Sequence, residues 1–455
     1  ISNNISTTIA AATPISFSAN ANFTGNVTVA GGTLQVKPTA VSGASGGNLF
    51  TNAQNLVFNT DALTGNGFAG GTFQLATPTA VTMTGNLIQT MGLLTPTAGT
   101  GKIQVDSGNG GFSNILSFNG YTTRGAGAVV NFAPAATLAG IQFAVVPTAV
   151  SGGVLSGAYI TNPTTGSIDF VGTPTANSNV AALNSATAVS GTGGAGNNYL
   201  VQTGGTSTAG VFAANTIRMT GAAPILTLGG TLTMTSTSAN VEGGILFDNG
   251  SGAGKIQGAF NITPSTGGQD LLFIVGGAGN LAGAANALTI GDATGGLTTL
   301  GNGTAASVTK AGAGMLILNG GNTYTGNTTI DEGTIRLGGT TTATLGTISA
   351  TGNTTTIRQL GTLDVNNSGA STVLYSGGPT MNLTTVGVVN GAGSITNSSG
   401  TLSILNNRNF FQDGNDTTIA VQVPLSIVGT DSNGDGKVDN RFDIWVDAFR
   451  KGGQL

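Results

Sequence analysis

The residues best placed to do chemistry in this sequence are acids near its C-terminal end, in the stretch DSNGDGKVDNRFD. Oxygen-bearing side chains at positions 1, 3, 5 and 9, a glycine at 6 and a backbone carbonyl at 7 are the pattern of an EF-hand calcium loop. The hard oxygen ligands surround the cation, and the glycine permits the sharp turn between them. The pattern predicts a calcium site, with a solvated acidic turn as the alternative. Its positions are held here by Asp431, Asn433, Asp435, Gly436, Lys437 and Asp439.

The end of this loop departs from the pattern. Position 12, where an acid usually binds calcium through both oxygens, holds Phe442, and Asp443 follows one residue later. We therefore expect either a loop that bulges by one residue, so that Asp443 reaches the cation, or a weaker site. The stretch resembles one dockerin-type calcium repeat. A complete dockerin carries two such loops, so this single loop does not predict cohesin binding.

A short helix is predicted directly after the loop. Phe442, Trp445 and Phe449 lie at i, i+3 and i+7, on one face of a helix. We interpret this segment as a cap over the end of a strand-rich body, with docking of a partner as the alternative. Charge supports a boundary here, because residues 1–411 hold ten acids and nine bases whereas residues 412–455 hold seven and four. The sequence thus predicts a body over residues 1–425 and a calcium-loop and helix segment over 426–455.

Elsewhere the chain offers little catalytic chemistry. It has no His and no Cys, which excludes Ser-His and Cys-His arrangements, and it has no Walker-type phosphate loop. Asp331 and Glu332 form the only adjacent acid pair, and neighbouring strand residues point to opposite faces unless a turn intervenes. A glycan-cleaving site needs several acids and bases on one face, although stacked strands can bring distant residues together. We expect no enzymatic activity.

The secondary-structure elements that would position the side chains of this chain are short strands. A unit of Gly-Thr followed by apolar, variable and apolar residues recurs along the chain, and this alternation is typical of a strand with one buried face. The variable residue would face solvent, and glycine and asparagine would form the corners between strands. The unit occurs at residues 32–36, 71–75, 230–234, 333–337, 361–365 and 400–404.

Such units cannot bury their apolar faces alone, so they predict a solenoid whose coils share one core. Coils of about 20 residues spaced about 4.8 Å apart would give a rod of roughly 100 Å. Aligning 333–337 with 361–365 places Arg336 beside Asp364 as an exposed ion pair on adjacent strands, 28 residues apart. The alternative is a series of β-sandwich domains. The predicted core contains Leu34, Val36, Ile335, Leu337, Leu363 and Val365.

One stretch of the repeats resembles a known family. The sequence KAGAGMLILNGGNTYTGNTTIDEGTIRLGG, residues 310–339, is similar to the autotransporter-associated β-strand repeat, also called the passenger-associated transport repeat. The full motif occurs once, and partial copies reach back to Asn22. The resemblance implies an all-β chain folded as a right-handed parallel β-helix and displayed outside the cell. The matching residues are Lys310, Gly312, Gly314, Leu316, Leu318, Gly320, Asn322, Thr323, Tyr324, Thr325 and Gly326.

Composition narrows the partners of this protein. A net charge of −4 gives no basic footprint for nucleic acid, and the absence of a run of about 20 apolar residues argues against insertion into a membrane. Low charge also gives copies little reason to stay apart, so we expect a homo-oligomer or polymer. These observations predict a secreted, extracellular or cell-surface structural rod that associates into a layer, fibre or matrix. The alternatives are an adhesin that binds a glycan or a cell-surface receptor and, third, a polysaccharide-cleaving β-helix enzyme.

Overall fold

The computed structural model is all-β, with no helix among the residues that it describes. Accordingly, none of the described segments contains a helix able to cross a membrane. The predicted calcium loop and helix, residues 426–455, lie outside the described residues. The structure describes residues 5–7, 15–17, 25–37, 49–50, 53–60, 70–77, 83–185, 187–202, 204–236, 241–248, 253–266, 268–277, 287–292, 294–303, 305–338, 343–347, 355–364, 375–376, 389–390 and 394–396.

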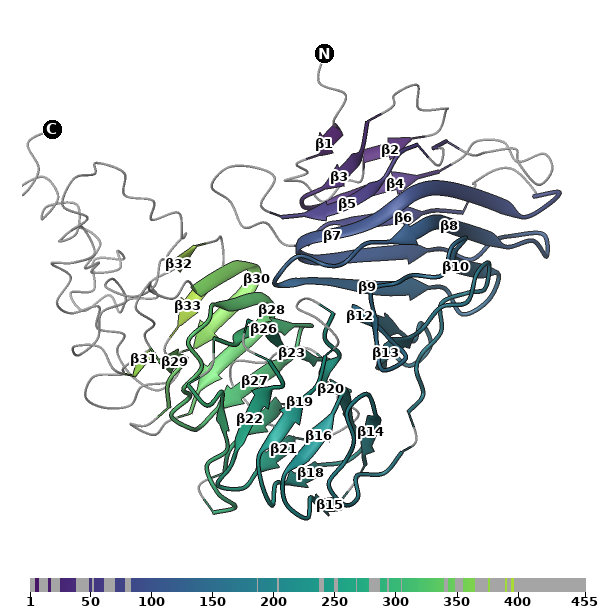
Figure 1. Cartoon of the computed structure of the whole chain (residues 1–455). Coiled ribbons are helices and arrows are strands. Elements are labelled where there is room, and N and C mark those ends of the chain that lie inside the picture. The colour runs from purple at the N-terminus through teal and green to yellow at the C-terminus, as the bar shows by residue number, and fades with distance from the viewer. Residues whose placement is uncertain are drawn as a thin grey trace, which may run out of the picture.

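The strands pair almost entirely in parallel and build two separate stacks, coloured purple to blue and teal to green in Figure 1. The first stack has two sides, and the long strand β7 turns the corner between them. One side consists of β1 (Ile5–Thr7), β3 (Val27–Val29), β5 (Leu56–Asn59), β7 (Leu87–Val105), β8 (Asn114–Tyr121) and β10 (Ala139–Phe143). The other consists of β2 (Ile15–Phe17), β4 (Thr33–Val36), β6 (Thr72–Leu75), β7, β9 (Ala128–Pro134) and β12 (Val154–Thr161), with β11 (Val150–Ser151) and β13 (Ile168–Gly172) antiparallel to β12.

The second stack has three sides. The first side consists of β14 (Asn198–Val201), β17 (Thr216–Thr220), β20 (Gly244–Asp248), β23 (Asp270–Val275), β26 (Ser307–Ala311), β28 (Thr328–Leu337), β30 (Thr355–Asp364) and β32 (Val389–Asn390). The second consists of β15 (Gly204–Ser207), β18 (Pro224–Thr227), β21 (Gly254–Gln257), β24 (Ala287–Ile290), β27 (Met315–Leu318), the later halves of β28 and β30, and β33 (Ser394–Thr396). The third consists of β16 (Phe212–Ala214), β19 (Leu232–Met234), β22 (Asn261–Pro264) and β25 (Thr299–Leu300), followed by the pair β29 (Gly346–Thr347) and β31 (Tyr375–Ser376).

The Gly-Thr units pack as their alternation predicts. In the first stack Leu34 pairs in register with Phe73, and Phe73 with Ile103, and all three side chains are fully buried. The residues between them face outward, where Gln35 Nε2 donates a hydrogen bond of 2.9 Å to Gln74 Oε1. A ladder of parallel strands with one apolar and one polar face confirms the predicted parallel β-helix. Five of the six predicted core residues are buried, namely Leu34, Val36, Ile335, Leu337 and Leu363, and Val365 lies outside the described residues.

The predicted register between 333–337 and 361–365 is also confirmed. Arg336 pairs with Asp364, and Ile335 with Leu363, on the adjacent strands β28 and β30. Arg336 Nε lies 2.6 Å from Asp364 Oδ2. The expectation of an exposed pair is wrong, because the Asp364 side chain is 0% exposed and that of Arg336 only 11%. The carboxylate lies beneath the guanidinium, so the pair belongs to the packed structure rather than to a solvated surface.

The two stacks replace the single rod expected from the sequence. On the first side of the first stack the parallel ladder stops at β10, because Gln142 forms an antiparallel bridge with Asn179 along the edge that a further coil would need. A new ladder begins with β14, and in Figure 1 its stacking direction crosses that of the first. Each stack has its own apolar core. The sequence separation between paired residues also varies, from 18 for Asn198 and Thr216 to 39 for Thr33 and Thr72, so the coils differ in the lengths of their loops.

Glycines at the corners set how closely the coils approach, and Gly312 gives a test of this. Its φ is +76°, and a Cβ built on it would lie 2.5 Å from the carbonyl oxygen of Val275 on the preceding coil. We expect Gly312→Ala to lower the free energy of unfolding by about 1–3 kcal/mol, since left-handed backbone strain and a backbone clash add. Gly303→Ala is the matched control, because Gly303 has φ +66° but nothing within 4 Å of its Cβ position. Equal losses in urea unfolding would show that the close approach has no cost.

Candidate functional site

The charged residues of the body are widely spaced along the sequence. In the folded protein, however, most of those that the structure describes gather where the two stacks meet. Of the nine acids that the structure describes before residue 412, six lie there, and so do five of the eight described bases. We call this region the junction. It consists of the acids Asp169, Glu242, Asp248, Asp270, Asp331 and Glu332 and the bases Lys102, Arg124, Arg218, Lys310 and Arg358.

Arg124 forms the first ion-pair group of the junction. It lies between β8 and β9 of the first stack, and its Nη2 donates to Glu242 Oε2 at 2.9 Å and to Asp270 Oδ2 at 3.0 Å, both on the second stack. The guanidinium is completely buried. Burial acts to lower the pKa of Arg124, but the two carboxylates outweigh it and raise that pKa. Burial likewise raises the pKa of Glu242, against the effect of Arg124. One cation therefore holds two buried acids from successive coils of the other stack.

Arg218 of the second stack forms a second group of one arginine and two acids, and here one acid comes from each stack. It projects from β17 of the second stack, and its Nη1 lies 2.9 Å from Asp169 Oδ2 on β13 of the first stack. Its Nη2 lies 3.0 Å from Asp248 Oδ2 on β20, and Asp248 Oδ1 accepts a bond from the backbone N–H of Ile168. Burial raises the pKa of Asp169 despite the nearby arginine. Each stack thus contributes one arginine to the other.

A third group surrounds the corner of β28. Arg358 Nε donates to Asp331 Oδ1 at 2.9 Å, and Thr100 Oγ1 of the first stack lies 3.4 Å from Asp331 Oδ2. Asp331 is buried, and the chain turns at Gly333, which has φ +72°. Adjacent strand residues such as Asp331 and Glu332 point to opposite faces unless a turn intervenes, and Gly333 provides a turn beside them. Burial raises the pKa of Glu332, opposed first by Lys310 and then by Lys102.

Lys310 is the buried cation of this third group. Its Nζ donates to three backbone carbonyls, those of Ala311 at 2.9 Å, Gly312 at 2.6 Å and Glu332 at 3.0 Å. The lysine of the repeat motif therefore closes the Gly-containing corner of its own coil and ties it to the next coil. Burial lowers the pKa of Lys310 to about 7, although Glu332 and Asp331 act in the opposite direction.

This pKa predicts a distinct pH dependence of stability. Between pH 7 and 10.5 the unfolded chain holds a proton on Lys310 that the folded chain lacks, so the free energy of unfolding should rise with pH. The slope should approach about 1.4 kcal/mol per pH unit, and below pH 7 this contribution should be constant. Urea unfolding of wild type and Lys310→Met from pH 6 to 10 measures it. Parallel curves for the two proteins would show that Lys310 titrates normally.

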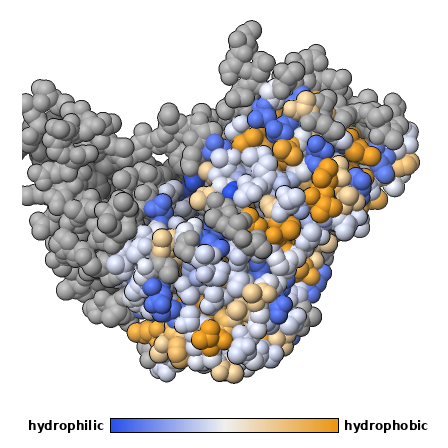
Figure 2. All heavy atoms as spheres, viewed as in Figure 1, coloured by the Kyte–Doolittle hydropathy of each residue, from blue (hydrophilic) through white to orange (hydrophobic). Residues whose placement is uncertain are grey.

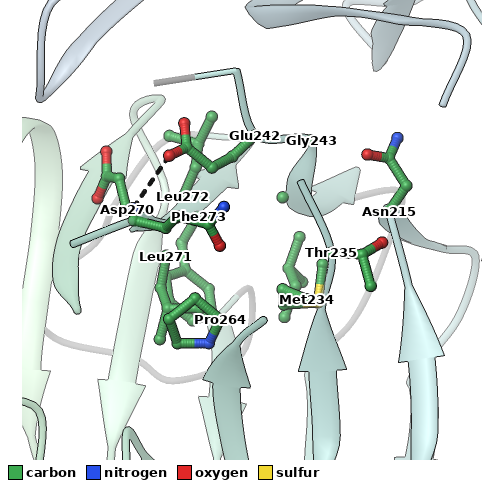
Figure 3. A pocket seen from close by; sticks show the side chains of 13 residues that line it. Asn215, Met234, Thr235, Glu242, Gly243, Pro264, Asp270, Leu271, Leu272 and Phe273 are labelled. Carbon is green, nitrogen blue, oxygen red and sulfur yellow. Dashed lines mark hydrogen bonds between the residues drawn. The ribbon is translucent and has the colours of Figure 1, made fainter. Parts of the chain in front are cut away.

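The space beside the Arg124 group is too small for a substrate. Figure 3 shows Glu242 accepting the backbone N–H of Asp270 at 3.3 Å, on one side of a cavity whose other wall carries Asn215. The cavity measures about 10 Å³, room for one water molecule. A second, open hollow of about 320 Å³ is lined by Leu183, Ser185, Thr187 and residues 196–198, none of them ionisable. Neither space brings an acid and a base to a site that a glycan can enter.

The residues of the repeat motif have structural contacts instead. Asn322 Oδ1 accepts the backbone N–H of Leu300 at 2.7 Å, and its Nδ2 donates to the carbonyl of Thr344, so one amide joins three coils. Tyr324 is fully buried, and its hydroxyl lies 2.7 Å from Thr328 Oγ1. Leu316 and Leu318 lie in the core. Each of these side chains therefore holds coils together.

The predicted calcium ligands cannot be placed, because Asp431, Asn433, Asp435, Lys437, Asp439 and Asp443 lie outside the described residues. Within the part that is described, no three His, Cys, Asp or Glu side chains come together as a metal site would require. Sequence reasoning missed the junction, since Arg124 lies 118 residues from Glu242 and 146 from Asp270. Among the junction residues, only Lys310 was singled out by the sequence, because it is the first residue of the repeat motif.

Comparison with known proteins gives one result, which agrees with this geometry. No curated protein and no solved structure matches the chain significantly. The two segments that do match a family model lie one in each stack, over the coil of β2 to β4 and over the coils of β26 to β28. Residues 16–36 and 308–337 match the model of the passenger-associated transport repeat.

Proposed function

We propose that this protein is a non-enzymatic, extracellular structural protein, a bent β-solenoid that associates with copies of itself. The main support for the proposal is that the charged side chains of the junction and the polar side chains of the repeat motif make structural contacts. The motif residues hold coils to one another, and buried ion pairs of the junction join the two stacks, at Arg124 and Arg218, or successive coils, at Arg358. The match to a transport repeat of passenger proteins supports secretion or display at the cell surface.

The absence of catalysis can be tested directly. A glycan-cleaving β-helix would need an acid and a base beside an accessible groove. We expect no new reducing ends or unsaturated products when the protein is incubated with a panel of acidic and neutral polysaccharides. Cleavage that disappears in Glu332→Gln would overturn the proposal and establish the enzymatic alternative.

The surface favours a structural role over an adhesive one. Figure 2 shows a face on which apolar and hydrophilic residues lie in several separate places, without one dominant patch. Phe260, 39% exposed, is the aromatic member of the exposed large apolar residues in the described segments, so no described aromatic cluster offers a sugar a stacking platform. Negative-stain images and sedimentation over a range of concentrations test self-association. Single particles throughout, together with a specific hit on a glycan array, would favour the adhesin.

Calcium binding by residues 431–443 is part of the proposal. The spacing of oxygen ligands supports it, and binding to the folded state alone would stabilise that state by about 2.7 kcal/mol at a calcium concentration 100 times Kd. We expect calorimetry to detect binding that Asp431→Ala with Asp435→Ala abolishes. Asp413→Ala with Asp416→Ala is the matched control, since these nearby acids lack the loop spacing. No heat of binding, and no change in melting on chelation, would leave an acidic turn.

A further inference from the structure

The two stacks have the properties of separately folded units. The apolar core of the first stack and that of the second share no residue, and no strand of one stack pairs with a strand of the other among the described residues. A third, smaller cluster lies between them, where Val129 and Phe170 of the first stack pack with Leu246 and Ile274 of the second. Undocking would therefore expose this cluster and the junction but leave both cores intact.

The contacts between the stacks are specific and reciprocal. Arg124 reaches two acids of the second stack, and Asp169 receives Arg218 from it. Ser151 Oγ donates to Asn215 Oδ1 at 2.6 Å, and Asn215 Nδ2 donates back to the Ser151 carbonyl at 2.9 Å. None of these contacts depends on the two stacks belonging to the same chain. Any first stack would fit any second stack.

The covalent connection between the stacks is short. Asn184 N–H donates to Asp169 Oδ2 of the first stack, and the carbonyl of Thr187 accepts the N–H of Leu200 in the first coil of the second stack. Asn184 itself has φ +51°, a left-handed conformation that few residues other than glycine and asparagine adopt. Short hinges favour the exchange of folded units between copies, because exchange keeps every contact between the units.

We propose that the junction is also the self-association interface of this protein, with the first stack of one chain docked on the second stack of another copy. The inference rests on the proposed self-association and specifies its site. The link holds the two stacks of one chain at an effective concentration on the order of millimolar, so docking within a chain prevails in dilute solution. Exchange between chains prevails when the protein is concentrated to a similar level. The partner chain then completes each ion-pair group.

A pair of single-cysteine variants tests this, since the chain has no cysteine of its own. Ser151→Cys and Asn215→Cys lie on different stacks, and their parent side chains touch. When the two variants are mixed at high concentration and oxidised, we expect a disulfide-linked heterodimer as a major product. Asn131→Cys and Thr161→Cys are the matched control, because these side chains also touch but both lie on the first stack. Exchange keeps residues 131 and 161 of each chain together, so this mixture should give at least several-fold less heterodimer.

Exchange of charges gives a second test that does not need oxidation. Arg124→Asp alone places three acids together, and Asp270→Arg alone places two arginines beside one acid. Mixing these two variants allows exchange to form one junction of wild-type charge and one with the pair reversed. We expect a heterodimer by native mass spectrometry that neither variant forms alone. Equal amounts of cross-linked product in the test and control mixtures, or no heterodimer in the charge test, would overturn the proposal.

These outcomes separate the interface from the proposed function. If wild-type protein assembles in sedimentation at high concentration while neither test gives a heterodimer, the junction is not the interface, but the structural role stands. If wild-type protein stays monomeric at every concentration and no heterodimer forms, both proposals fail.

Discussion

Arg124→Met should lower the free energy of unfolding by about 3–5 kcal/mol, the range for removing one partner of a buried ion pair. Methionine keeps most of the length of the side chain but leaves Glu242 and Asp270, which are 5% exposed each, without their shared cation. The carboxylates can then avoid the cost only by taking up protons or by drawing the stacks apart. Urea unfolding measures the loss, and small-angle scattering detects a larger radius of gyration if the stacks separate.

The control for Arg124 is an ion pair within one stack. Lys255 Nζ lies 2.6 Å from Asp292 Oδ2, but the lysine side chain is 40% exposed. Lys255→Met should therefore cost about 0–1 kcal/mol and leave the radius of gyration unchanged. Adding Glu242→Gln and Asp270→Asn to Arg124→Met should recover part of the loss, because the unpaired charges are then removed. A cost for Arg124→Met no larger than that for Lys255→Met would show that the junction does not hold the stacks together.

Tyr324→Ala should have an effect of similar size, about 3–5 kcal/mol, for a different reason. Tyr324 is the aromatic residue of the repeat motif, and its ring is fully buried in the core of the second stack. Its removal leaves a cavity beside Gly346, whose Cβ position would lie 3.1 Å from the Tyr324 ring. Urea unfolding monitored by circular dichroism measures the cost.

Tyr324→Phe separates the ring from the hydroxyl. It keeps the ring and removes the hydroxyl that hydrogen bonds with Thr328, so we expect a loss of about 1 kcal/mol. If both variants lose the same amount, the hydroxyl rather than the buried ring explains the place of tyrosine in the motif. If neither loses stability, the motif tyrosine is not a core residue of this stack.

The individual coils could be predicted from local patterns of residues. Alternation of apolar and variable residues identified Leu34, Ile335, Leu337 and Leu363 as core, and the repeat of Gly-Thr units predicted a solenoid of stacked coils. The same alignment identified the register of Arg336 with Asp364, 28 residues apart. Each coil packs mainly on the next coil. The alternation within a strand therefore predicts which side chains are buried, and alignment with the following unit predicts the register.

The ends of the stacks and the pairing of the charges, in contrast, depend on contacts between distant coils. The break after β10 depends on an antiparallel bridge at Asn179, and no local pattern marks it. Arg124 pairs with acids 118 and 146 residues away, and a lone charge in a strand-rich chain does not reveal such partners. Burial also depends on packing between coils, which lowers the pKa of Lys310 to about 7 and encloses the side chain of Asp331. Desolvation and pairing across two stacks are properties of the assembled fold, since both arise only when distant coils meet.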